Sequence, residues 1–577
     1  MPLSCRMTSW RALAIVALCA AALASQAAAQ DSGWSPFKES PSRSHERRPP
    51  AREPVPADVP QGPSGSYQRP QPRTPTVERL DLDPVAAPDA SGLPLELWRG
   101  LDLAGLERLL SSLELPPQSP TMFGLWKRML MSQASPPAGA PPDHFLAVRL
   151  EALYRSGLLA EMGEAGGAQQ GPVIAALMAR RDIGLGDAEK GCGYIRSLTD
   201  PRSGLPERLR GEIQLLNGYC AARAGDRNAA GLAVSLAREE GLEAELPLAV
   251  LSGIAEDTKP RIALGKRALL LDYRFLELLG PVNARQLAER AEPALLAVIA
   301  GDQRADLSAR IVAAEAGLRV NAVRPDAVAD IYRLLPPGGA DADPVLRRAQ
   351  QFRLSEQAAA GPAVSSALGG VLREARRAGF GLQMAEVVAA RFARSPPLGS
   401  DMVLAEIAAE TLLAAGRVAE ARQAAAPVPH WTALIDIVDP ARKTWRPGSL
   451  AVIEELAVRG RMSPDALHRM ATVLDALDID VPVPLWDAAN RSPQPNGGYL
   501  PETGALAELA QSAQRKETAR TILLAMKALG PQGPDATHIL PLGDTIRALR
   551  RVGLEADARR LALEALLPVW PRYGAAQ

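Results

Sequence analysis

The chain has 577 residues, of which 47% are hydrophobic, 23% charged and 4% aromatic, and its 65 basic and 65 acidic residues give a formal net charge of zero. This balance provides no positive field for DNA or RNA, and the low aromatic content leaves few rings to stack on single strands. The length exceeds what one compact core accommodates, so we expect two or more domains or an extended array.

A secretory leader is predicted over residues 1–29. Two arginines precede the apolar run 12–24, and small residues follow it up to Ala29. This order of basic, apolar and small residues is typical of a cleaved signal peptide. The apolar run is shorter than the roughly 20 residues that a bilayer span needs. We therefore expect cleavage near Ala29 and a periplasmic or secreted mature protein without a membrane span.

The cysteine count changes when the leader is removed. Cys5 and Cys19 leave with it, and Cys192 and Cys220 remain. Two cysteines in an exported chain suggest one disulfide. However, a helical hairpin that turns at 199–204 would offset the two by roughly 13 Å, and a disulfide needs Cα atoms within about 7 Å. A bridge and two buried thiols both remain open.

A proline-rich tract follows the leader, over residues 30–92. Thirteen prolines interrupt it, with Arg, Ser and Glu between them and few large aliphatic residues. Such a stretch buries too little apolar surface to offset its ordering entropy. We predict a disordered tether.

From Leu93 onward the pattern is helical. Leucines recur every three or four residues over 103–113, which indicates one apolar face of a helix. An N-cap residue followed by proline marks four predicted helix starts, at Ser119-Pro120, Asp343-Pro344, Asp439-Pro440 and Ser463-Pro464. No segment has a convincing strand pattern, so the predicted fold class is all-α.

A glycine-centred turn between an apolar helix and an Ala-rich helix recurs at 154–161, 222–230, 414–425, 458–467 and 550–562. This turn chemistry is typical of tetratricopeptide-like helical hairpins. Successive turn glycines are 37 and 44 residues apart, for Gly379 to Gly416 and Gly416 to Gly460, so a regular 34-residue array is excluded. We predict an irregular α-solenoid, with an ordinary Ala/Leu-rich helical domain as the alternative.

The clearest internal break lies at 336–344, where prolines and glycines separate two segments with helical sequence patterns. We interpret it as a hinge loop between an N-terminal half, 93–335, and a C-terminal half, 345–577. One continuous solenoid and two separate bodies both remain possible.

The loop at 490–500 is the leading candidate for binding a partner. Arg491, Asn496 and Tyr499 combine charge, hydrogen bonding and one aromatic face on a flexible segment. The alternative is that Tyr499 only fastens the loop to the core.

Residues 500–504 spell LPETG, the sortase recognition motif, but 73 charged and amphipathic residues follow where a membrane span would be needed. We expect instead that Thr503 caps a helix beginning near Ala505.

No motif supports catalysis, a cofactor or a metal. The five histidines lie at least 38 residues apart, and no paired C-x-x-C is present. No phosphate-binding loop, dinucleotide fingerprint or nucleophile elbow occurs in the helical part. We therefore name no catalytic, cofactor-binding or metal-binding residue.

Several stretches resemble a group of exported bacterial proteins labelled antifreeze glycopeptide-related: 93–130, 145–159, 498–513, 520–534 and 546–567. The resemblance covers most of the chain after the tether and implies no catalytic residues. The chain has no Ala-Ala-Thr repeat, on which antifreeze glycopeptides are built, so the label carries no ice-binding activity here.

The sequence thus predicts a non-catalytic exported helical scaffold that binds another envelope protein. The alternatives are a helical enzyme acting on cell-wall glycan and a structural periplasmic spacer.

Overall fold

The structure is a computed structural model that describes residues 89–572, apart from 168–170, 199–204, 337, 339–342, 359–361, 395–400, 443–447, 449 and 496. The predicted leader and nearly all of the predicted tether lie outside the described residues.

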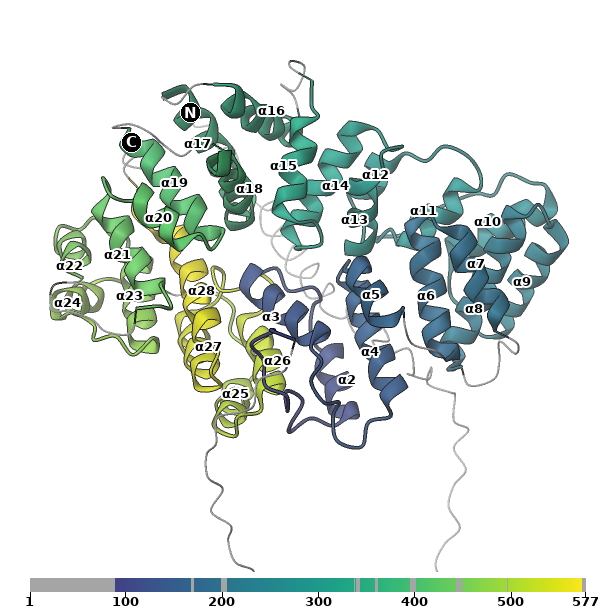
Figure 1. The fold of residues 1–577 in the computed structure, drawn as a ribbon, viewed down its shortest axis with the longest axis horizontal. Coiled ribbons are helices and arrows are strands. Elements are labelled where there is room, and N and C mark those ends of the chain that lie inside the picture. The colour runs from purple at the N-terminus through teal and green to yellow at the C-terminus, as the bar shows by residue number, and fades with distance from the viewer. Residues whose placement is uncertain are drawn as a thin grey trace, which may run out of the picture.

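The described part of the chain consists of 27 α-helices and one short 3-10 helix, η1, with no strand (Figure 1). The prediction of an all-α fold is therefore confirmed. The first helices of the chain are α2 (Leu103–Ser111), α3 (Pro120–Met131), α4 (Pro142–Arg155), α5 (Leu159–Gly166), α6 (Pro172–Leu185), α7 (Ala188–Ser197), α8 (Glu207–Arg223), α9 (Arg227–Glu239), α10 (Glu245–Glu256) and α11 (Leu270–Glu277).

The middle of the chain forms α12 (Ala284–Ala288), α13 (Pro293–Gly301), α14 (Leu307–Arg319), α15 (Pro325–Arg333), α16 (Pro344–Gln357), α17 (Pro362–Arg377), α18 (Gly381–Arg394), α19 (Met402–Ala414) and α20 (Val418–Ala424). The last part forms α21 (Pro429–Val438), α22 (Ala451–Val458), α23 (Pro464–Ala476), α24 (Val483–Arg491), α25 (Ala505–Gln514), α26 (Thr518–Leu529), α27 (Ile539–Arg551), α28 (Glu555–Leu566) and η1 (Leu567–Val569).

All five predicted glycine-centred turns lie between two helices, and each central glycine has a positive φ, between +63° and +87°. At Gly225, between α8 and α9, a Cβ would meet no atom within 4 Å, so the backbone conformation alone requires glycine. At Gly157, between α4 and α5, a Cβ would lie 2.9 Å from Pro293 O and from Ala322 Cβ. That glycine therefore also permits close packing against α13 and the residues after α14.

Three of the four predicted proline-led helix starts are confirmed. Ser119, Asp343 and Ser463 are N-caps whose side chains accept a backbone N–H in the first turn of α3, α16 and α23. The prediction at Asp439 is wrong, because this residue is the C-cap of α21. Proline is common just past a helix C-terminus because it cannot continue the helix, and Pro440 occupies that position.

The prediction that Thr503 caps α25 is also wrong. The N-cap is Gly504, with φ at +92° and no side-chain cap. The helix does begin at Ala505, as expected.

The helices vary in length from five residues in α12 to 17 in α8 and show no fixed-length repeat. The tetratricopeptide-like solenoid therefore stays a prediction.

In Figure 1 the chain runs from α2–α5 through α6–α11, α12–α15 and α16–α24, and returns with α25–α28 to the side of α2 and α3. Helix α3 packs against α26 and α28, and α2 packs against α26. The path of the helices thus closes on itself, which brings the beginning and the end of the helical region into contact.

A polar junction at this closure is built around the start of α3. The Glu564 carboxylate on α28 accepts hydrogen bonds from Ser119 Oγ (2.5 Å), Thr121 N (2.7 Å) and Thr121 Oγ1 (2.5 Å). The Asn321 side chain, just after α14, donates to the Gln118 carbonyl at 3.0 Å, and the Gln383 side chain on α18 donates to the same carbonyl at 3.0 Å. The segment before α3 therefore ties three distant parts of the chain together.

The helices on either side of the predicted hinge loop are in contact. Helix α15 packs against α16 and α18, and α14 packs against α16. The buried apolar side chains form one cluster that includes residues of both predicted halves.

Candidate functional site

Two of the three predicted partner-binding residues lie in the described structure, at the end of α24 and in the segment that follows it. Arg491 is the last residue of α24, is exposed, and donates from Nε to the Asp487 carbonyl at 3.2 Å. Asn496 lies outside the described residues. Tyr499 follows in the loop, with 38% of its surface exposed. Within the described residues, the hydrogen bonds of Arg491 and Tyr499 go to different partners and not to each other.

Tyr499 is held by its backbone as well as by its ring. Its N–H donates to the Ala536 carbonyl at 2.8 Å, and its carbonyl accepts from His538 N at 3.1 Å. A Cβ on Gly530 would lie 2.5 Å from the Tyr499 ring, so this glycine makes room for the aromatic side chain. The tyrosine therefore fastens the loop to the segment between α26 and α27.

The neighbouring helix α24 exposes two large apolar side chains that sequence analysis did not single out. Val483 is 71% exposed and Trp486, one turn later, is 53% exposed. On another face of the same helix, Leu485 is fully buried and Ala489 is 3% exposed. We call Val483 and Trp486 the α24 apolar surface. Their spacing, i and i+3, places them on one side of the helix.

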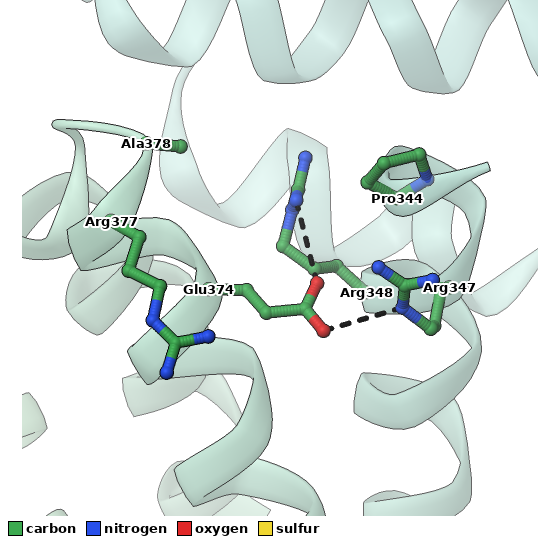
Figure 2. Close-up of a pocket in the computed structure, with 6 residues that line it drawn as sticks. All are labelled: Pro344, Arg347, Arg348, Glu374, Arg377 and Ala378. Atoms are coloured by element: carbon green, nitrogen blue, oxygen red, sulfur yellow. Dashed lines mark hydrogen bonds and ion pairs between the residues drawn. The ribbon is translucent and has the colours of Figure 1, made fainter. Parts of the chain in front are cut away.

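An arginine pocket lies between α16 and the end of α17. It is an open hollow of about 290 Å³ lined by Pro344, Arg347, Arg348, Glu374, Arg377 and Ala378. Figure 2 shows Glu374 between Arg347 and Arg348 on one side and Arg377 on the other. Ala378 also lines the pocket. It directly precedes Gly379, the turn glycine, whose φ is +77°.

Two of the three arginines in this pocket form ion pairs, and these pairs have different roles. The Arg348 side chain is only 5% exposed. It donates hydrogen bonds to the buried Glu315 carboxylate from Nε (3.1 Å) and from Nη2. Burial raises the pKa of Glu315, which Tyr332 also contacts through its hydroxyl. Arg348 therefore stabilises the core.

Arg347 and Arg377 form the accessible charge of the pocket. Arg347 Nε donates to Glu374 at 3.3 Å, and its side chain remains 39% exposed. Arg377 is exposed and makes no ion pair or hydrogen bond with any residue of the described structure. Glu374 is 25% exposed, and its Oε2 is enclosed, 3.6 Å from Arg348 Nη1. The surface that solvent reaches is therefore predominantly positive.

A second group of ionisable side chains lies beside the polar junction. Glu386 on α18 accepts from Arg560 Nη2 on α28 at 2.7 Å, and its side chain is 16% exposed. Burial raises the pKa of Glu386 to about 7, Arg560 opposes that shift, and the nearby Glu564 adds to it. Burial also raises the pKa of Glu564. The two carboxylates form part of the contact between α18, α28 and α3.

Cys192 on α7 and Cys220 on α8 form a disulfide in the structure, with their Cα atoms 5.9 Å apart. The expected offset of roughly 13 Å between the two cysteines holds for a hairpin that turns within 199–204. Helix α7 ends at Ser197 and α8 begins at Glu207, so nine residues connect them. At about 3.3 Å per extended residue, this connection is long enough for α8 to begin beyond the end of α7 and bring the two cysteines level.

The described residues contain neither a cluster of metal ligands nor a helix able to span a membrane. No group of three or more His, Cys, Asp and Glu side chains is placed to hold a metal ion. Within the same residues, no helix has both the length and the apolar character needed to cross a membrane.

Sequence reasoning missed the arginine pocket, the α24 apolar surface and the Glu386–Glu564 group. Only the first had a readable signal: residues 344–377 contain six arginines and two glutamates, a surplus of four positive charges in a chain of zero net charge.

Comparison with known proteins gave no match to a family model, to a curated protein or to a solved structure.

Proposed function

We propose that this chain is a non-catalytic α-helical scaffold of the cell envelope that binds another envelope protein through the α24 apolar surface. The observation that carries the proposal is the exposure of Trp486 and Val483, at 53% and 71%, on a helix whose other face is buried. The envelope compartment rests on the predicted leader at 1–29.

Apolar surface that faces water is unfavourable by about 25 cal/mol per Å², so covering a tryptophan and a valine favours association. Tryptophan is among the residues that contribute most to binding energy at protein interfaces. Leu500, in the loop that follows α24 in the chain, is 57% exposed and provides a further apolar side chain near the candidate loop residues. These features support binding of a protein rather than of a small molecule.

The test is affinity capture of the tagged full chain from crosslinked cells, with Trp486→Ala as the test variant. Leu232→Ala is the matched control, because Leu232 is a large apolar residue, 61% exposed, on the distant helix α9. We expect one partner to be recovered with the wild type and the control, and at least about tenfold less with Trp486→Ala, the effect of losing an interface hot spot.

Two outcomes would contradict the proposal. The first is the absence of any partner in samples where a control envelope complex survives capture. The second is equal recovery with Trp486→Ala and the wild type, which would remove the α24 apolar surface from the contact.

A further inference from the structure

The arginine pocket is lined by three arginines and one glutamate, and one of these arginines, Arg377, is not neutralised by any acidic side chain of the described structure. Six arginines and two glutamates lie within residues 344–377, and the whole chain is neutral. Arg348 and Arg376 are paired with Glu315 and Glu410, which are buried, so these arginines stabilise the packing of α16 and α17. Arg377 has no partner in the described structure and borders the same hollow.

The geometry of the pocket suits a carboxylate. Two guanidinium groups that solvent reaches, on Arg347 and Arg377, come from different helices and line one hollow of about 290 Å³. A guanidinium presents a planar fork of N–H donors that matches the two oxygens of a carboxylate. A carboxylate of the chain itself lies beside Arg347, since Glu374 accepts a hydrogen bond from Arg347 Nε at 3.3 Å.

We propose that the arginine pocket is a binding site for an acidic peptide segment, whose Asp or Glu carboxylate is held by Arg377 and Arg347. The hollow is open and has about the volume of one or two side chains, and Arg348 lines it with a side chain that is only 5% exposed. Two accessible guanidinium groups match one carboxylate side chain of a peptide, whereas binding to a flat anionic membrane is typical of clusters of about four to eight basic residues. The proposal concerns a surface separate from α24 and does not depend on the function proposed above.

The experiment measures binding of a fluorescent ten-residue peptide of alternating Glu and Gly to the full chain with its disulfide intact, by fluorescence anisotropy. A peptide with Gln in place of Glu is the neutral probe. The variants are Arg377→Gln and, as the matched control, Arg324→Gln. Arg324 has a side chain that is 77% exposed, and it forms an ion pair with the nearby Asp326. Arg377 is exposed and unpaired, so its replacement leaves the fold intact, which circular dichroism checks.

We expect the Glu peptide to bind, and Arg377→Gln to lower the affinity about tenfold, the size of one charge-assisted hydrogen bond. Arg377→Lys retains the charge and should restore part of that loss. The affinity should also fall as salt is added, because the pocket is open to screening. Arg324→Gln should bind like the wild type.

Any of three results would overturn the proposal. The Gln peptide binds as well as the Glu peptide, or Arg377→Gln binds like the wild type, or both arginine variants lose affinity equally. In a parallel experiment, phosphatidylglycerol vesicles or inorganic phosphate are added to the bound peptide, to test whether either anion displaces it. Competition by either at a concentration matched to the peptide would assign the pocket to that anion and would also overturn the proposal.

Discussion

Glu386 gives the sharpest test of the contact between α18 and α28. Its carboxylate faces Arg560 and lies near Glu564, and burial raises its pKa from an ordinary 4.5 to about 7. The folded state therefore binds a proton that the unfolded state releases between these two pH values. Stability from this group is fully present below pH 4.5 and is lost as the pH rises through about 7.

The size of the effect follows from the two pKa values. Each pH unit between them is worth about 1.4 kcal/mol, so the group costs the folded state about 3 kcal/mol by pH 8. The side chain is only 16% exposed, so solvent screens little of this cost. Glu386→Gln keeps an acceptor for Arg560 but does not titrate, so it should remove this part of the pH dependence.

The assay is urea unfolding followed by circular dichroism at pH 4.5 and pH 8, for the wild type and Glu386→Gln. Between the two pH values, the wild type should lose about 3 kcal/mol more stability than the variant. Glu455→Gln, at an exposed glutamate paired with Arg459 one turn away, is the control and should follow the wild type. An equal pH dependence in the wild type and Glu386→Gln would refute the reasoning, as would a larger loss in the variant.

Three further predictions concern stability, each measured by the same urea unfolding at neutral pH. Glu564→Ala leaves the buried donors at the start of α3 without their acceptor and should lower the free energy of unfolding by about 3 kcal/mol. Glu564→Gln should lower it less, and equal losses would contradict the role of the carboxylate. Replacing Cys192 and Cys220 by serine removes a crosslink between residues 28 apart in the sequence and should lower the free energy of unfolding by about 3–4 kcal/mol. An unchanged urea midpoint would contradict this prediction. Gly225→Ala should cost about 1 kcal/mol for its backbone conformation alone, and Gly157→Ala at least twice that because a Cβ would also meet atoms 2.9 Å away; the reverse order would refute the packing argument.

Local signals in the sequence predicted the local structure well. The five turn glycines and three of four proline-led helix starts were readable, because a positive φ and a side-chain cap depend on neighbouring residues alone. The failure at Asp439 shows the limit of this reasoning. An Asp-Pro pair marks a helix start or the residue after a helix end equally well, and the packing of α21 decides between them.

Contacts between distant segments had no readable signal. Nothing in the sequence around Ser119 indicates that Glu564, 445 residues later, accepts its hydroxyl. Similarly, the arginine surplus over 344–377 was readable, but not that Arg348 has a buried partner and Arg377 has none in the described structure. The candidate sites therefore depend on which distant helices pack together, and helix propensities and caps do not determine that packing.

The central claim is that this helical body binds a protein partner through the α24 apolar surface. The most direct measurement is site-specific photocrosslinking in cells, with a photoreactive phenylalanine derivative at position 486 in one strain and at position 232 on α9 in another. Both side chains are exposed, at 53% and 61%, so both report on their surroundings equally well. We expect one discrete crosslinked protein at position 486 and none at position 232. No adduct at 486, or the same adducts at both positions, would contradict it.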